Sequence, residues 1–522
     1  MKTRPLRELV AQMVMPRIDG PKLAEPEYRE RIETLVREGI GGFILFGGDT
    51  RETPRLLQSL QDLAAVPLLI ASDVERGLGQ QLSGGTRFPS QRAVSSAINR
   101  RSKKDALLLD RMLDAVRQET RAAGIHIVFS PVVDVNNNPD NPIICTRAFG
   151  DEPEVVEWFG SRYIKGLQKA GDLLACAKHF PGHGDTDQDS HSVLPVIRAD
   201  RQRLNRIELP PFREAVKDGV AMVMVAHLMV PALDPAAPTT FSKKIVTALL
   251  REGLGFEGLI VSDALDMGAL AREYSPEEIA VRSVEAGMDI LLHPLNARGT
   301  VDAVVSAVEQ GKLTRERIEE SVGRIMLAKT KLGLFEKKSQ TAAAVEYEKH
   351  RAIARELGGR ALRIVNGKDI LPVQSDTGIA CFILDDDNNR ESANAFLREM
   401  KERFPNFAFL ILTPDAAMPA SLVRDSIHAA GLVVLAVYSR ISASKGRSGI
   451  SEKLSAMARE ILSTTGEEGG PSVVISFDSP YILDLFKDAD VRIAAYDRME
   501  DIQRAAAGVL AVKKSGVAGR RR

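Results

Sequence analysis

The sequence has few of the features that mark several protein classes. Only 3 of its 522 residues are cysteines. Cys145, Cys176 and Cys381 are too scattered, and odd in number, to form a disulfide or zinc framework. No uninterrupted apolar stretch is long enough to span a bilayer, and no apolar core of a signal peptide follows the basic N-terminus. We therefore expect reduced, buried thiols in a cytoplasmic protein with no membrane partner.

The sequence also has no excess of charge of either sign. Lys+Arg and Asp+Glu balance at 70 each, so bulk electrostatics does not favour binding to a polyanion, and we expect no nucleic-acid partner. Internal repeats and low-complexity blocks are absent. The composition is that of a globular protein, with 44% hydrophobic and 27% charged residues. The length predicts two domains.

Short apolar runs alternate with helical patterns over the first 335 residues or so. There are eight such runs, at 10–16, 42–46, 67–72, 125–133, 173–179, 221–226, 258–262 and 288–292. Most are continuous enough for a sheet that is buried on both faces. Eight β–α units in this length fit a (β/α)8 barrel better than an open doubly wound sheet. The open sheet remains an alternative, because the number of strands alone does not force closure.

Helical patterns fill the intervals, among them 27–38, 104–123 and 153–170. Another helix begins well at Ser275, the expected cap, with Pro276 in the first position and Glu278 in the third. We predict a barrel over 1–335, a linker over 336–350, an open α/β sandwich over 351–510 and a disordered basic tail over 511–522. The sandwich rests on further apolar runs at 379–384, 407–412, 431–437, 471–477 and 491–496.

Polar side chains follow five of the predicted barrel strands. These residues are Asp73, Asp134, Lys178, His179, His227 and Asp263. The C-terminal ends of parallel barrel strands share one rim, where active sites lie. We therefore expect all of them except Asp134 and His227 to converge in one site. For His227, a satisfied rim or core histidine is the expected reading.

The segment 178–191 reads Lys-His-Phe-Pro-Gly-His-Gly-Asp-Thr-Asp-Gln-Asp-Ser-His. It holds three of the chain's 8 histidines, three aspartates and one lysine. An apolar run at 173–177 precedes it, and two glycines and a proline break regular structure within it. A buried strand thus delivers titratable groups into a loop, which is a usual place for chemistry. The glycines would let this loop move over a substrate and exclude water.

One chemical reading is glycoside hydrolysis with retention, which needs a carboxylate nucleophile and a proton donor. Asp263 is the candidate nucleophile and His191 the candidate donor. Asp189 lies two positions from His191, so both side chains can face one site if the loop is extended there. A carboxylate beside an imidazole fixes its tautomer and raises its pKa, as acid–base work requires.

Four further residues could bind sugar hydroxyls through charge-assisted hydrogen bonds. They are Asp73, Arg147, Lys178 and His179. Two other readings remain open. One is a metal-dependent hydrolase with zinc ligands from His179, His183, His191, Asp185, Asp187 and Asp189, although their spacing matches no helical H-x-x-x-H site. The other is a non-catalytic sugar-binding or structural protein.

At these residues the sequence resembles glycoside hydrolase family 3, in its β-N-acetylhexosaminidase branch. Residues 178–184, followed by 189–191 and by Leu194 and Pro195, are similar to the signature of that branch. Residues 262–267 resemble its nucleophile segment, 141–142 with 147–150 its sugar-binding arginine segment, and 73–77 its sugar-binding aspartate segment.

The resemblance implies a (β/α)8 barrel and double-displacement hydrolysis. Asp263 would form the glycosyl-enzyme intermediate, and His191, paired with Asp189, would act as acid and then as base. The terminal sugar would be bound by Asp73, Arg147, Lys178 and His179. The implied substrate is a non-reducing terminal β-N-acetylglucosamine, and the resemblance points to muropeptide fragments in a bacterial cytosol as its source.

The resemblance implies no metal and no organic cofactor, and it leaves a monomer or a homodimer open. The alternatives within the family are a β-glycosidase or a glycoside phosphorylase of different sugar preference. A neutral imidazole does not repel phosphate as a carboxylate does. The glycosyl intermediate could therefore pass to phosphate instead of water.

Overall fold

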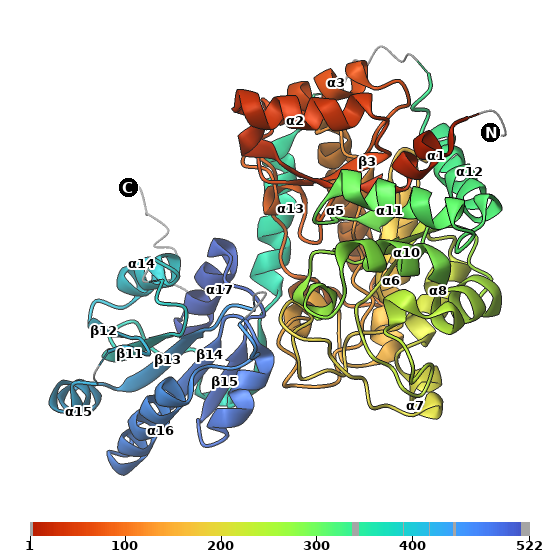
Figure 1. Ribbon diagram of the computed structural model, residues 1–522. Helices are drawn as coiled ribbons and strands as arrows, with labels where there is room; N and C mark the ends of the chain where they lie inside the picture. Colours follow the sequence, from red (N-terminus) through yellow and green to blue (C-terminus); the bar gives the residue numbers. More distant parts are fainter. Residues whose placement is uncertain (1–3, 337–343, 390, 417, 442–444, 513–522) are drawn as a thin grey trace. The chain divides into compact units, whose positions relative to one another are not determined.

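The computed structural model describes residues 4–336, 344–389, 391–416, 418–441 and 445–512, which form two compact units (Figure 1). The first unit comprises Met1–Gln91, Arg100–Ala354 and Ala443–Gly446, and the second comprises Arg92–Asn99, Arg355–Ser442 and Arg447–Arg522. The predicted linker falls partly on 337–343, outside the described residues, and α13 (Tyr347–Arg360) begins within its second half. Most of the predicted tail also lies outside them, although Ala511 pairs with Val373. The predicted domain boundaries stay predictions.

Parallel strands close into a barrel in the first unit. They are β1 (Val14–Met15) with β2 (Arg17–Asp19), β3 (Gly42–Phe46), β4 (Leu69–Ser72), β5 (Ile127–Val128), β6 (Leu174–Phe180), β7 (Met222–Val225), β8 (Leu259–Ser262) and β9 (Leu291–Leu292). Hydrogen-bonded neighbours run in order from β2 to β8. A bridge between Val261 and Ile290 joins β8 to β9, and β9 pairs with β1. The ring is complete, which confirms the predicted (β/α)8 barrel.

Helices connect the strands and cover the outside of the barrel. They are α2 (Pro26–Arg37), α3 (Thr53–Leu63), α5 (Lys103–Ala122), α6 (Pro153–Gln168), α7 (Arg201–Arg206), α8 (Pro210–Lys217), the helix Lys244–Gly253, α10 (Pro276–Ala286), α11 (Ala297–Glu309) and α12 (Arg315–Lys331). Ser275 accepts a hydrogen bond from the amide of Glu278, N···O 3.1 Å, which is the predicted cap. Because helices cover the strands, β4 and β6 are buried along their whole length, as their unbroken apolar runs predict.

The prediction of a strand over 10–16 is wrong in its first half. Residues Leu6–Gln12 form the helix α1, and the strand begins only at Val14. Leu9, Val10 and Ala11 are buried on this helix, and a short apolar run of this kind does not distinguish a buried helix from a buried strand. The run 125–133 also holds a shorter strand than predicted, because Pro131 lacks the N–H that a ladder requires.

The second unit contains a six-stranded sheet in the order β10-β15-β14-β13-β11-β12. Its strands are β10 (Arg363–Asn366), β11 (Ile379–Asp385), β12 (Phe407–Leu412), β13 (Leu432–Tyr438), β14 (Ser472–Ser476) and β15 (Val491–Ala494). Figure 1 shows α14 (Asn394–Arg403) and α17 (Glu500–Leu510) on one face, with α15 (Ala420–His428) and α16 (Glu452–Glu467) on the other. This confirms the predicted open α/β sandwich. The antiparallel edge strand β10 was not predicted, because its residues are partly exposed and carry no continuous apolar run.

All three cysteines lie among the described residues, and their thiols are buried and form no disulfide. No helix in the described ranges combines the length and the apolar character needed to cross a membrane.

Candidate active site

The C-terminal ends of neighbouring barrel strands carry the predicted polar residues. Asp73 follows β4, His227 follows β7 by two positions, and Asp263 follows β8 directly. Lys178 and His179 are among the last three residues of β6, which ends at Phe180. These ends share one rim because the strands are parallel.

Lys178 is buried at this rim, 2% exposed. Its Nζ lies 2.7 Å from Oδ1 of Asp73 and 2.7 Å from Oε1 of Glu75. Burial opposes the charge, but the two carboxylates outweigh it and hold the pKa of Lys178 above its ordinary value. The lysine is therefore a permanent cation that is already paired in the protein.

Glu75 was not predicted as a site residue, yet it joins two residues that were. Its carboxylate contacts Lys178 and accepts two hydrogen bonds from Arg147, at 3.0 and 2.7 Å. Burial alone would raise the pKa of Glu75, but the charges of Arg147 and Lys178 hold it well below its ordinary value. The guanidinium of Arg147 also lies 3.4 Å from Nε2 of His179. A fork-to-fork pair of this kind fixes the plane of the guanidinium.

Asp134 organises the histidines of the same strand end. This fully buried carboxylate lies 2.7 Å from Nδ1 of His179 and accepts from the amides of His179 and His183, at 3.2 and 2.7 Å. Burial alone would raise its pKa, but the contacts with His179 and His183 lower it. Because a carboxylate accepts, Nδ1 of His179 carries the proton, and Nε2 faces Arg147.

The loop after β6 packs against the loop after β5, and a histidine links its two ends. Gly184 lies so close to the loop after β5 that an added Cβ would be 1.8 Å from the carbonyl oxygen of Val135. The Nε2 atom of His183 lies 3.1 Å from Oγ of Ser190, which links the two ends of the loop. Burial lowers the pKa of His183 to about 4, so its ring is neutral. Close packing is thus one reason for a glycine in this loop.

His191 and Asp189 form a pair at the mouth of the site. Nδ1 of His191 lies 2.8 Å from Oδ1 of Asp189, which also accepts from the amide of His191 at 2.9 Å. The imidazole is 37% exposed, whereas the carboxylate is 1% exposed. The two side chains meet without the extended loop that was the stated condition for it. The amides of Ser192 and Val193 donate to the carbonyl of Asp189, so the pair forms in a turn that brings the two side chains together.

Asp263 is partly exposed, and its carboxylate has a sparse set of partners. Among the described residues, its one hydrogen bond comes from the amide of Ala264 to Oδ1, 2.8 Å. Burial alone would raise its pKa, but the imidazoles of His179 and His227, the Ala264 amide and the positive charge of Lys178 lower it to about 2. Asp263 is therefore ionised at neutral pH, and none of the described residues donates a hydrogen bond to its Oδ2.

The loop that carries His191 rests on the loop that follows Asp263. An added Cβ on Gly268, five residues after Asp263, would lie 2.7 Å from the carbonyl oxygen of His191. This close approach brings the backbone of His191 against the loop that follows Asp263.

The arrangement does not match the zinc reading. His179, His183 and His191 each have a different partner, namely Asp134, Ser190 and Asp189. Within the described part of the chain, no three His, Cys, Asp or Glu side chains are grouped as metal ligands. Of the candidate aspartates, Asp189 is paired with His191 and Asp185 with Arg203.

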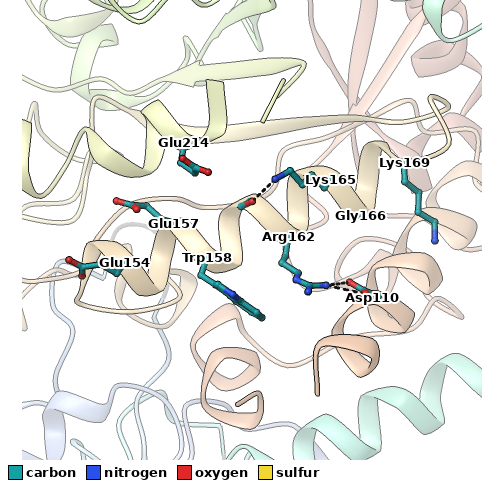
Figure 2. A pocket seen from close by; sticks show the side chains of 10 residues that line it. Asp110, Glu154, Glu157, Trp158, Arg162, Lys165, Gly166, Lys169 and Glu214 are labelled. Atoms are coloured by element: carbon teal, nitrogen blue, oxygen red, sulfur yellow. Dashed lines mark hydrogen bonds and ion pairs between the residues drawn. The ribbon is translucent and has the colours of Figure 1, made fainter. Parts of the chain in front are cut away.

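A surface hollow of about 750 Å³ lies along α6, and its lining includes none of these residues (Figure 2). The chain's one tryptophan, Trp158, has the guanidinium of Arg162 5.3 Å from its ring centre. Asp110 on α5 holds Arg162 at 2.9 Å. The hollow belongs to the outward faces of the barrel helices, so its size does not indicate the site of the chemistry, which the polar rim marks instead.

A (β/α)8 barrel whose rim holds an ionised carboxylate, a His–Asp pair, a buried lysine and a half-buried arginine has the groups that glycoside hydrolysis requires. The model of the "Glycosyl hydrolase family 3 N terminal domain" matches residues 5–328. The chain belongs to glycosyl hydrolase family 3.

Similar proteins have names from one branch of this family. The chain is 31% identical over 439 residues to "Beta-hexosaminidase A" of Pseudoalteromonas piscicida, over 78% of this chain and 72% of that protein. It is 31% identical to "Beta-N-acetylglucosaminidase/beta-glucosidase" of Cellulomonas fimi, over 67% of this chain and 63% of that protein. A solved family 3 β-N-acetylglucosaminidase from Paenibacillus sp. str. FPU-7 superposes with a TM-score of 0.82 at 27% identity, covering 97% of this chain and 96% of that one. The predicted resemblance is confirmed.

Proposed function

We propose that this protein is a retaining exo-β-N-acetylglucosaminidase. It hydrolyses non-reducing terminal β-linked N-acetylglucosamine, with muropeptide fragments in the cytoplasm as the proposed source. The observation that carries the proposal is the pairing of His191 with Asp189 over the loop that follows an ionised Asp263. The names of the relatives support the choice of sugar.

Asp263 acts as the nucleophile in the first step. Its low pKa, about 2, keeps it ionised, and Oδ2 is unencumbered. The carboxylate oxygen forms a bond to the anomeric carbon as the bond from that carbon to the leaving oxygen breaks. Protonated His191 gives its Nε2 proton to the leaving oxygen in the same step.

His191 then reverses its role. Neutral Nε2 takes a proton from water while the water oxygen attacks the anomeric carbon and the bond to Asp263 breaks. Two inversions give net retention, and both groups return to their starting states. Asp189 supports this cycle because it holds Nδ1–H in one tautomer and stabilises the imidazolium.

The cluster around Lys178 binds the terminal sugar. Lys178, His179, Arg147 and Asp73 offer donors and acceptors to its hydroxyl groups. Glu75 and Asp134 hold these side chains before the sugar arrives. The binding groups therefore need little reorganisation when the reaction begins, and preorganised groups of this kind lower the free energy of the transition state.

Hydrolysis of a panel of aryl β-glycosides that differ only at the 2-position tests this proposal. A kcat/KM that strongly favours 2-acetamido over 2-hydroxy substrates is expected. Equal values would place the protein with the β-glucosidases of the family, and no turnover on any member would leave a sugar-binding protein. Adding a chelator should change nothing, and a loss of rate would revive the metal-dependent reading.

The acceptor is decided by identifying the product. The neutral form of His191 tolerates phosphate as well as water. We expect free N-acetylglucosamine in buffers with and without phosphate. A sugar 1-phosphate that appears only with phosphate would identify a phosphorylase instead.

A further inference from the structure

His227 lies at the end of the strand beside the proposed nucleophile and is fully buried. It follows β7, which pairs with β8 through Val225 and Ser262. The amide of Asp263 donates to the carbonyl of Val225, N···O 2.9 Å. The end of β7 therefore supports the start of the segment that carries Asp263.

Both ring nitrogens of His227 have partners. Nε2 lies 2.9 Å from the carbonyl oxygen of Ala264, and Nδ1 lies 2.6 Å from Oγ1 of Thr240. A carbonyl oxygen can only accept, so Nε2 carries a proton and donates it. In a neutral ring, Nδ1 then accepts from the hydroxyl of Thr240, at the shorter of that hydroxyl's two contacts; the other is with the carbonyl oxygen of Ala226, 3.1 Å away.

The peptide between Ala264 and Leu265 is held from both sides. Its oxygen accepts from His227, and its N–H donates to the carbonyl of Leu292 at the end of β9, 2.9 Å. The preceding amide, that of Ala264, donates to Oδ1 of Asp263. The contacts from β7 and β9 to this segment through Val225 and Leu292 are backbone contacts. The imidazole of His227 is a support that a substitution can remove, as is that of His293, whose Nδ1 lies 3.2 Å from Asp266.

The charge state of His227 suits a place beside a nucleophile. Burial holds its pKa below its ordinary value, against the opposing charges of Asp263 and Asp266. A neutral ring offers an N–H dipole without a full charge. Asp263 loses its charge when it bonds to the sugar, and a neutral neighbour loses no ion pair in that step.

We propose that His227 is a positioning residue for the nucleophile. Its Nε2–H holds the carbonyl of Ala264 and thereby fixes the direction in which Asp263 presents its carboxylate to the anomeric carbon. This inference rests on the proposed role of Asp263. The sugar-binding cations are untouched by the contact, so its loss should lower kcat and leave KM nearly unchanged.

Two substitutions separate this role from simple packing. His227→Gln keeps an N–H near the place of Nε2, whereas His227→Leu removes both polar atoms. With an activated aryl glycoside, which needs no protonation, the step at Asp263 is measured directly. We expect His227→Leu to lower kcat by about 100-fold, the effect of roughly 1 Å of misplacement, and His227→Gln to recover at least about tenfold of that loss.

His126→Leu is the matched control, since it also removes a buried barrel histidine. His126 lies just before β5, at the opposite end of the barrel from His227. Its Nδ1 accepts a hydrogen bond from the amide of Ile70 in β4, 3.1 Å away. A loss of stability without a loss of kcat is expected there. Wild-type kcat in His227→Leu, or Gln and Leu variants that melt like the wild type and are equally slow, would overturn the inference.

Thr240→Val serves if His227→Leu does not fold. This substitution removes the hydroxyl that contacts Nδ1, so the imidazole of His227 can rotate away from Ala264. A lower kcat at unchanged KM supports the inference, whereas an unchanged kcat overturns it. These ratios can be measured on whichever aryl glycoside the wild type hydrolyses best. If the wild type does not hydrolyse 2-acetamido glycosides, the proposed substrate is wrong. The comparison of kcat between the His227 variants and the wild type can still be made on another aryl glycoside.

Discussion

Two lysines are buried in the barrel, one near each end, and their surroundings are opposite. Lys178, at the C-terminal rim, touches two carboxylates at 2.7 Å, and its pKa is raised. Lys329, near the N-terminal end, donates to the neutral Oε1 of Gln12 at 2.6 Å. Burial lowers the pKa of Lys329 to about 7. Gln12 precedes β1 and bonds the carbonyl of Gly39 ahead of β3, which fixes this end of the barrel.

The difference shows what a buried charge requires. Burial removes water from both ammonium groups, which costs free energy. Of the two, Lys178 has this cost offset by attraction to carboxylates. A charged cluster at the rim is useful because a polar ligand can share it. At the other end, a single amide gives Lys329 no such compensation. Changes at the rim should therefore alter activity, and a change at Lys329 should alter stability.

Asp263→Ala should have the largest effect. We expect turnover to fall by about 10⁴-fold, roughly 5 kcal/mol of barrier. The melting temperature should stay close to that of the wild type, because within the described ranges the carboxylate accepts one hydrogen bond, from the neighbouring amide. Turnover is measured with an aryl 2-acetamido glycoside, and an unchanged rate would remove Asp263 from the mechanism.

His191→Ala should depend on the leaving group. Loss of the proton donor should cost about 10³-fold on alkyl or saccharide leaving groups, and far less on activated phenols. His428→Ala is the matched control, because its imidazole makes a similar contact with Glu468 on the surface of the second unit. Equal losses of kcat/KM on both substrate types would count against the acid–base role.

Glu75→Gln should harm both activity and folding. It leaves Arg147 and Lys178 sharing fewer negative charges, and breaking a buried pair costs about 3–5 kcal/mol. We expect chemical denaturation to show most of that loss and kcat/KM to fall as well. Glu33→Gln removes a carboxylate that also lies between two arginines, but near the surface of α2. It should cost under about 1 kcal/mol, and similar costs for both variants would refute the buried-pair account.

Lys329→Met should change the free energy of unfolding by the smallest amount, and it should stabilise the protein where the other substitutions weaken activity or folding. The folded pKa of Lys329, about 7, lies below the value of 10.5 for an exposed lysine. The unfolded chain then binds more protons between these values, so the stability of the wild type rises with pH across that window. The variant should be more stable by about 1 kcal/mol near pH 6. Its advantage should shrink by pH 9 in denaturant titrations, and an advantage that grows with pH would contradict the account.

Strand ends were the most predictable part of the molecule. Asp73, Lys178 and Asp263 could be assigned to one rim because an apolar run precedes each and parallel strands share their C-terminal end. Glu75 was missed because its role depends on a contact with Arg147, 72 positions along the chain. Nothing in the local sequence distinguishes such a carboxylate from a surface glutamate.

Local conformation limited the prediction elsewhere. Residues 10–16 carry one apolar run, but the boundary between α1 and β1 depends on packing that the run does not encode. The pairing of His191 with Asp189 was considered for an extended loop, and it occurs in a turn. Residue spacing indicated the pair, whereas its geometry depends on how the loop folds.

The stereochemistry of azide rescue tests the role of Asp263 most directly. With Asp263→Ala, an activated β-glycoside and azide, a single displacement from the vacated face should restore turnover. The predicted product is the α-glycosyl azide, because one displacement inverts the anomeric carbon. A β-glycosyl azide, or an Asp263→Ala variant that needs no rescue, would contradict the assignment of Asp263 as the nucleophile.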